Sequence, residues 1–185
     1  MQTRAKYLPR HPSERGFTLI ELMTVVVIVG VLATIGLVAY RRFIQSSKTS
    51  EAIYMVGAIR SGEESYRAET LSYLDVTSGF SKYYPKEVPD NSKTVWGIAG
   101  DDKDRWLQLG ARPDGPVYYG YKAGAGGATA VPPTLTGLAT PPTWPATTGP
   151  WYVILAKGDV DANGTASYVA GSSFTGEIYV ENEGE

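Results

Sequence analysis

One long apolar run stands near the start of the sequence. From Phe17 to Tyr40 the sequence carries a single charged side chain, Glu21, in 24 residues. A helix needs about 20 apolar residues to cross the hydrocarbon core of a bilayer. The run therefore predicts a membrane-spanning helix over residues 17–40.

Between residues 41 and 70 the apolar positions follow the period of an amphipathic helix. They recur at spacings of three and four and are Ala52, Met55, Val56, Ile59, Gly62 and Tyr66. No proline stands between Phe17 and Pro85, so nothing forces the helix to stop. We predict one helix from Phe17 to about Thr70, with an apolar inner half and an amphipathic outer half.

The pattern after Thr70 changes from helical to extended. Residues 71–93 are rich in Ser, Pro, Asp and Asn and predict a long connecting loop. Six runs with β-branched and aromatic residues follow, at 94–99, 105–111, 116–123, 151–158, 166–170 and 176–182. They indicate an antiparallel sheet. Packed on the outer half of the helix, this sheet gives an α+β fold with a β-rich globular head over residues 71–185.

Residues 123–150 interrupt these runs with a segment of unusual composition. Ala, Gly, Pro and Thr make up 24 of its 28 residues, and none is charged. Such a segment predicts an exposed, partly extended insertion that buries little. A passive loop is the simplest interpretation; a variable surface patch, or an acceptor of O-linked sugar on its seven threonines, are the alternatives.

Charge and composition narrow the functional classes. Residues 1–16 form a leader with four cations and one acid, which favours the cytoplasmic side of a membrane. The net charge of −2 gives no indication of a nucleic-acid surface. Cysteine is absent, and the one histidine, His11, lies in the leader. Without these side chains and without a paired catalytic motif, we expect no enzyme and no catalytic residue.

The junction between leader and span carries the most specific motif. It reads Arg15-Gly16-Phe17-Thr18-Leu19-Ile20-Glu21. From Gly16 to Leu22 the sequence resembles the prepilin family, which comprises type IV pilins and the pseudopilins of type II secretion. The resemblance implies a pilin fold. It also implies that a prepilin peptidase and methyltransferase of the membrane cleaves after Gly16 and methylates the new amino terminus at Phe17.

Glu21 is an acid placed one turn into a predicted membrane span. Such a carboxylate costs about 2.5–3.5 kcal/mol on insertion scales and is usually paired or functional. Cleavage after Gly16 creates a positive amine on Phe17, and the amine of a neighbouring copy is the expected partner. The pair would register each subunit against the previous one during assembly. The alternative is that Glu21 merely reaches the lipid headgroups.

A second motif lies between two predicted strands. Asp159, Asp161 and Asn163 alternate before Gly164, as in the first half of a calcium-binding loop of the EF-hand type. The twelfth position is Ala170, where an EF-hand has a bidentate Glu, so a complete EF-hand is excluded. The alternative is a turn led by Asn-Gly. Calcium is therefore a candidate ligand, and no other metal or required cofactor is expected.

The resemblance implies a structural function. We expect a single-pass precursor in the bacterial inner membrane that is processed at Gly16 and Phe17 and then polymerises, through its helix, into a cell-surface filament. Adhesion, twitching motility and DNA uptake are the roles of such filaments. The implied partners are further copies of the chain, the processing peptidase, an inner-membrane assembly platform, an outer-membrane secretin and membrane lipid. The alternatives are a type II secretion pseudopilin and a calcium-dependent binding head on a single-span anchor.

Overall fold

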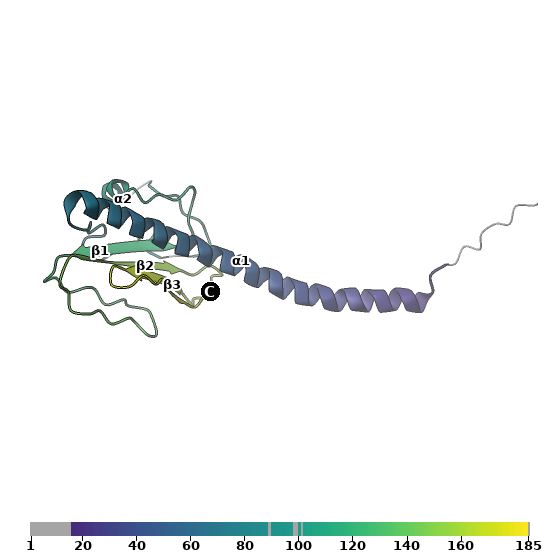
Figure 1. Ribbon diagram of the computed structural model, residues 1–185. Helices are drawn as coiled ribbons and strands as arrows, with labels where there is room; N and C mark the ends of the chain where they lie inside the picture. The colour runs from purple at the N-terminus through teal and green to yellow at the C-terminus, as the bar shows by residue number, and fades with distance from the viewer. Residues whose placement is uncertain (1–15, 89, 98–99, 101, 185) are drawn as a thin grey trace, which may run out of the picture. The chain divides into compact units, whose positions relative to one another are not determined.

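The computed structural model describes residues 16–184 apart from 89, 98–99 and 101. The elements in chain order are α1 (Leu19–Thr70), α2 (Lys103–Leu109), β1 (Gly120–Gly126), β2 (Trp151–Gly158), β3 (Ser167–Ser172) and β4 (Tyr179–Glu181), labelled where there is room in Figure 1. The chain divides into two compact units, Met1–Tyr40 and Arg41–Glu185. We call the second one the head unit. Leader residues 1–15 lie outside the described part.

Helix α1 begins two residues after Phe17 and ends at Thr70, where its end was predicted. Within the head unit, one stripe of this helix is buried, as the sequence period predicted, at Ala52, Met55, Val56 and Ile59. Gly62 and Tyr66 are only half-buried. The stripe instead continues through a carboxyl side chain, Glu63.

The four strands form one antiparallel sheet in the order β1-β2-β3-β4. Tyr121 pairs with Ala156, Leu155 with Ala170, and Val169 with Val180. Since strand side chains alternate between the two faces, the sheet has two apolar faces. Ile154, Ala156 and Val169 belong to one hydrophobic cluster, and Val153, Leu155 and Ala170 belong to another. Both clusters are buried, so both faces of the sheet are covered.

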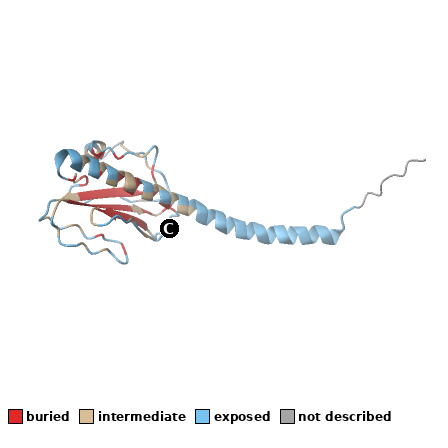
Figure 2. Cartoon of the chain, in the orientation of Figure 1, coloured by how far each residue is buried: buried red, intermediate tan, exposed pale blue. Residues whose placement is uncertain are grey.

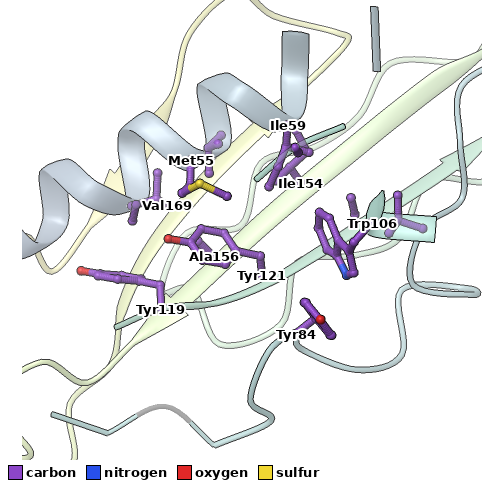
Figure 3. Packing of buried hydrophobic residues seen from close by; sticks show 14 of the residues in the cluster. Met55, Ile59, Tyr84, Trp106, Tyr119, Tyr121, Ile154, Ala156 and Val169 are labelled. Carbon is purple, nitrogen blue, oxygen red and sulfur yellow. The ribbon is translucent and has the colours of Figure 1, made fainter. Parts of the chain in front are cut away.

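The outer half of α1 covers the first face (Figure 1). Met55 and Ile59 point from the helix toward Ile154, Tyr121 and Val169, as Figure 3 shows. Trp106 of α2 and Tyr84 of the connecting loop close the side of this cluster. Replacing a fully buried Ile such as Ile59 by Ala would cost about 2–5 kcal/mol, because the surroundings cannot collapse into the space. The stripe is therefore a main source of stability for the head unit.

Residues 127–150, which follow β1 and which we call the insertion, cover the second face. Leu135 and Leu138 are buried there against Leu155, Tyr168 and other residues of the second cluster. Gly137 has a φ of 100°, and a Cβ at this position would lie 2.3 Å from the Tyr168 hydroxyl. The prediction that residues 123–150 form an exposed insertion that buries little is therefore wrong at these two leucines and at residues 123–126, which belong to β1. The two leucines are among the four residues in 123–150 that are not Ala, Gly, Pro or Thr.

Three predicted strand runs differ from the structure. Residues 103–109 form α2 rather than a strand, because Trp106 and Leu109 are buried together at the i, i+3 spacing of a helix face. Gly110, with a φ of 74°, ends α2 in the left-handed conformation that glycine adopts readily. Thr94 forms only an isolated bridge to Val117, so the described part of the run 94–99 is not a strand. The run 116–123 becomes a strand only at Gly120, where β1 begins. Ile98 and Ala99 lie outside the described residues.

The C-terminal segment ties the elements of the head unit together. The Glu181 carboxylate accepts hydrogen bonds from Ala139 N–H (2.8 Å) in the insertion and from the Tyr179 hydroxyl (2.7 Å), and both lower the pKa of Glu181. Glu183 accepts a hydrogen bond from the Ser46 hydroxyl of α1 at 3.0 Å. Gly184 N–H donates to Thr49 Oγ1 at 3.2 Å. The chain has no cysteine, so polar contacts of this kind take the place of covalent cross-links.

Glu63 is a fully buried acid in the stripe of α1. Its Oε2 accepts a hydrogen bond from Leu74 N–H at 2.9 Å, whereas its Oε1 has no partner among the described residues. Burial raises the pKa of Glu63 to about 8, the Leu74 hydrogen bond opposes this, and the charges of Asp75 and Glu64 add to it. The folded head unit therefore holds this carboxyl in its protonated form near neutral pH.

Replacing Glu63 by Gln should remove one source of pH dependence from stability. The folded pKa lies above the ordinary value of 4.5, so the contribution of Glu63 is complete below pH 4.5 and is lost as the pH rises toward 8. The slope approaches about 1.4 kcal/mol per pH unit within this window. Denaturant unfolding in detergent from pH 4 to 9 should give a flatter profile for Glu63→Gln. Glu69→Gln, at an exposed position of the same helix, is the control. Equal slopes for all three proteins would contradict the prediction.

Candidate functional site: the processing junction and the apolar helix

The Gly16–Phe17 peptide bond lies ahead of the first turn of α1. Both residues are non-helical and exposed, and Phe17 has 87% of its surface accessible. Apart from Gly16 and its two chain neighbours, no atom of the described residues lies within 4 Å of the position of a Cβ built on Gly16. Exposed non-helical backbone of this kind is the preferred substrate of proteases. The geometry therefore leaves the predicted cleavage site open.

Thr18 and Glu21 form a reciprocal capping box at the start of α1. The Glu21 carboxylate accepts hydrogen bonds from Thr18 N–H (2.8 Å) and from the Thr18 hydroxyl (2.7 Å). Glu21 N–H in turn donates to Thr18 Oγ1 at 3.3 Å. Thr-x-x-Glu ahead of an apolar run is the sequence signature of this cap, so Thr18 could have been identified from the sequence. Within one chain, the carboxylate thus has local partners that offset part of the cost of burying it in lipid.

The inner half of α1 exposes a largely apolar surface whose one charged side chain is Glu21. Every residue from Gly16 to Tyr40 is exposed, as the pale blue helix turns of Figure 2 illustrate. Of the described part of the chain, α1 is the one helix long and apolar enough to cross a membrane. Arg41 and Arg42 follow the span, and both are exposed. A bilayer or other apolar helices are the environments that suit this surface.

The candidate calcium residues lie in a tight turn between β2 and β3. Asp159 accepts hydrogen bonds from Asn163 N–H (3.2 Å) and Gly164 N–H (3.1 Å), and Asp161 accepts one from Asn163 N–H (3.2 Å). Asn163 Oδ1 accepts a hydrogen bond from Thr165 N–H at 2.6 Å. Within residues 16–184, leaving out 89, 98–99 and 101, no three His, Cys, Asp or Glu side chains gather as a metal site. These hydrogen bonds close the loop of residues 159–166, in which Ala162 and Gly164 have positive φ and Asn163 does not. Calcium binding stays a prediction.

The comparisons with known proteins agree with this geometry. Residues 11–37 match the prokaryotic N-terminal methylation motif. The chain is 43% identical over 91 residues to the type IV major pilin protein PilA of Myxococcus xanthus, which is 49% of this chain and 41% of that protein. It is 43% identical over 83 residues to the type IV major pilin protein PilE of Neisseria gonorrhoeae, which is 40% of this chain and 50% of that protein.

A third relative is the fimbrial protein EcpC of Eikenella corrodens, 41% identical over 56 residues, which is 30% of this chain and 37% of that protein. The chain thus spans half or less of the length of these relatives. No solved structure matches the chain. The methylation motif joined to a long helix and an α+β head supports a precursor of the prepilin type. Within that class, the motif and the relatives support the type IV pilin family.

Replacing Thr18 by Ala should loosen the first turn of α1. Loss of an N-cap side chain costs about 1 kcal/mol, which corresponds to roughly fivefold faster opening. Amide hydrogen exchange of residues 18–22 in detergent micelles measures this opening. Thr24→Ala is the matched control, because the Thr24 hydroxyl donates to Ile20 O within the helix and caps no free N–H. Equal protection in the two variants would contradict the cap.

Calcium binding to the Asp159 turn is testable by thermal unfolding. A ligand present at 100 times its dissociation constant stabilises the folded state by about 2.7 kcal/mol. If the turn binds calcium, the midpoint of unfolding should fall on chelation and recover when calcium is added. Asp161→Asn, which removes one candidate ligand charge, should abolish the difference. A melting curve that is the same in calcium and in chelator would contradict calcium binding by Asp159, Asp161 and Asn163.

Proposed function

We propose that this chain is the precursor of a structural filament subunit that is cleaved after Gly16, methylated on the amine of Phe17 and polymerised through α1. The observation that carries the proposal is the exposed apolar inner half of α1, most of which lies within the residues that match the methylation motif. Cleavage at this bond leaves the whole apolar helix on the product. The helix therefore has to serve the mature protein, whereas a secretory signal discards its apolar segment.

The apolar surface of the inner half makes a polymer more stable than a solitary subunit outside the membrane. Fully burying one Val, Leu, Ile, Phe or Met side chain contributes about 1.5–3 kcal/mol. The exposed apolar residues of the span include Leu19, Ile20, Leu22, Met23, Val25, Val26, Val27, Ile28, Val29, Val31, Leu32, Ile35, Leu37 and Val38. A single subunit would lose this stabilisation on leaving lipid. Helices that pack against one another in a filament regain it.

In this proposal, Glu21 has one partner in the single chain and another in the filament. In the single chain, the Thr18 capping box holds its carboxylate. Cleavage after Gly16 places a cationic amine on Phe17, four residues before Glu21 in the sequence. In a filament, the amine of the adjoining subunit pairs with Glu21 and fixes the register of one helix against the next.

The head unit forms the surface of the filament in this proposal. Before assembly the subunit is held in the inner membrane by its span, with the leader on the cytoplasmic side. Its partners are other copies of itself, the prepilin peptidase and methyltransferase, an inner-membrane assembly platform and an outer-membrane secretin. Adhesion, twitching motility and DNA uptake are the roles proposed for the filament. The function is structural and involves no enzymatic activity.

Replacing Glu21 by Ala should separate membrane insertion from assembly. Insertion should continue, because the change removes a charge from an apolar segment. Filament yield should fall sharply, because the amine of the neighbouring subunit would be buried without its partner, at a cost of about 3–5 kcal/mol. Membrane fractionation and electron microscopy of cell-surface fibres measure the two effects. Glu69→Ala, at an exposed position of the outer half, is the control, and normal fibres from Glu21→Ala would contradict the assembly role.

Isolation of the cellular form tests the proposal as a whole. Surface fibres should consist of a subunit that begins at methylated Phe17, as read by mass spectrometry of sheared material. Long fibres support the cell-surface filament, whereas short fibres found only with a functioning secretion system support a type II secretion pseudopilin. A subunit that still begins at Met1, or that stays solitary in the bilayer, overturns both interpretations. The calcium-dependent binding head would then be the candidate to examine.

A further inference from the structure

The threonines of the insertion differ from the other threonines of the chain in what their hydroxyl groups contact. Outside the insertion, seven of the nine described threonines have a hydrogen-bonded hydroxyl: Thr18, Thr24, Thr34, Thr49, Thr70, Thr77 and Thr175. Inside it, the Thr147 hydroxyl donates to Ala128 O at 2.7 Å. The hydroxyls of the other six, Thr129, Thr134, Thr136, Thr140, Thr143 and Thr148, have no hydrogen bond among the described residues, and all six are exposed.

The backbone that carries these threonines is held in place. Leu135 and Leu138 are buried against the sheet. The indole of Trp144 donates to Pro133 O at 2.8 Å, and the indole of Trp151 donates to Ala130 O at 3.0 Å. The large apolar side chains of the insertion thus face the sheet, with the exception of Val131, while the threonines face outward. In a passive linker, apolar side chains and threonines would not be sorted onto opposite sides of the segment in this way.

The chemistry of the outward surface is uniform. The insertion carries no charge and has six prolines, which hold much of its backbone extended and keep it out of the sheet. Threonine-rich segments with proline are typical of O-glycosylated surfaces. The exposed surface offers little else to a ligand: Val131 is 88% accessible, and the remaining side chains are Ala and Pro. We infer that the six free threonines of the insertion are acceptors for O-linked sugar.

The transfer needs a glycosyl donor of stated chemistry. A glycosyl diphosphate, carried on a lipid or a nucleotide, supplies an activated anomeric carbon. A bond forms between threonine Oγ1 and this carbon, the bond from the carbon to the phosphate oxygen breaks, and the diphosphate leaves with its electron pair. The hydroxyl proton passes to the base of the transferase. Thr147 is not an acceptor, because its hydroxyl is already engaged with backbone carbonyls.

The sequence provides a clean measurement of this modification. Trypsin cleaves after Lys122 and Lys157, and no Lys or Arg lies between them, so one peptide, 123–157, contains all seven threonines of the insertion and no serine. Peptide 158–185 contains Thr165, Thr175 and three serines and serves as the internal control. The full chain, isolated from the envelope of its own cells, should yield peptide 123–157 with added mass equal to one or more sugar units. Peptide 158–185 should have its unmodified mass.

Base-induced elimination locates the sugar, because each modified threonine becomes a dehydro residue. A variant with the six free threonines changed to Ala should lose all added mass from peptide 123–157, whereas Thr147→Ala should retain it. Peptide 123–157 of the wild-type chain at its unmodified mass overturns the inference without any variant. So does added mass that maps to Thr147 alone or to peptide 158–185 alone. The N-terminal peptide in the same digest reports separately on cleavage after Gly16, so the inference and the proposed function fail independently.

Discussion

The packing of the stripe on α1 against the first face of the sheet is the constraint on which the head unit depends. Ala52, Met55, Val56 and Ile59 are completely buried there, and nothing on the inner half of the same helix is buried. One continuous helix therefore presents two kinds of surface. The outer half buries this stripe within its own chain, and the apolar inner half suits lipid or other helices. In the proposed function, folding and assembly therefore use different segments of α1.

The acids of α1 show how strongly location changes the role of one side-chain type. Glu21 lies at the first turn, where the N–H groups of a helix start favour a carboxylate, and Thr18 supplies two of its hydrogen bonds. Glu63 lies in the buried stripe, where one N–H group, from Leu74, faces it. Burial holds Glu63 protonated near neutrality. Glu51 is a third case, since it accepts Tyr118 N–H at 2.7 Å and lies 3.6 Å from the Lys93 ammonium.

The sequence predicted those features that depend on long regular patterns. The end of α1 at Thr70, the stripe around Met55 and the strands at 151–158 and 166–170 follow from period and composition. Short or isolated features were missed. Helix α2 has only seven residues, about two turns, so its Trp106–Leu109 spacing competes with an equally plausible strand pattern. Glu63 continues the stripe at i+4 from Ile59, but a charged residue does not register as apolar, and only the fold shows that it is enclosed. The processing junction was recognisable because its motif is local, whereas the anchoring of the insertion depends on Tyr168 and Leu155, which lie far along the chain.

The insertion and α1 cover opposite faces of the sheet, so substitutions in one need not disturb the packing of the other. Substitutions on the outward side of the insertion touch neither the stripe on α1 nor the register of β1 with β2, provided that Leu135, Gly137 and Leu138 keep the segment on the sheet. In the proposed filament, the chemistry of the outer surface can therefore change between related chains while the helix surfaces that pack the subunits stay the same.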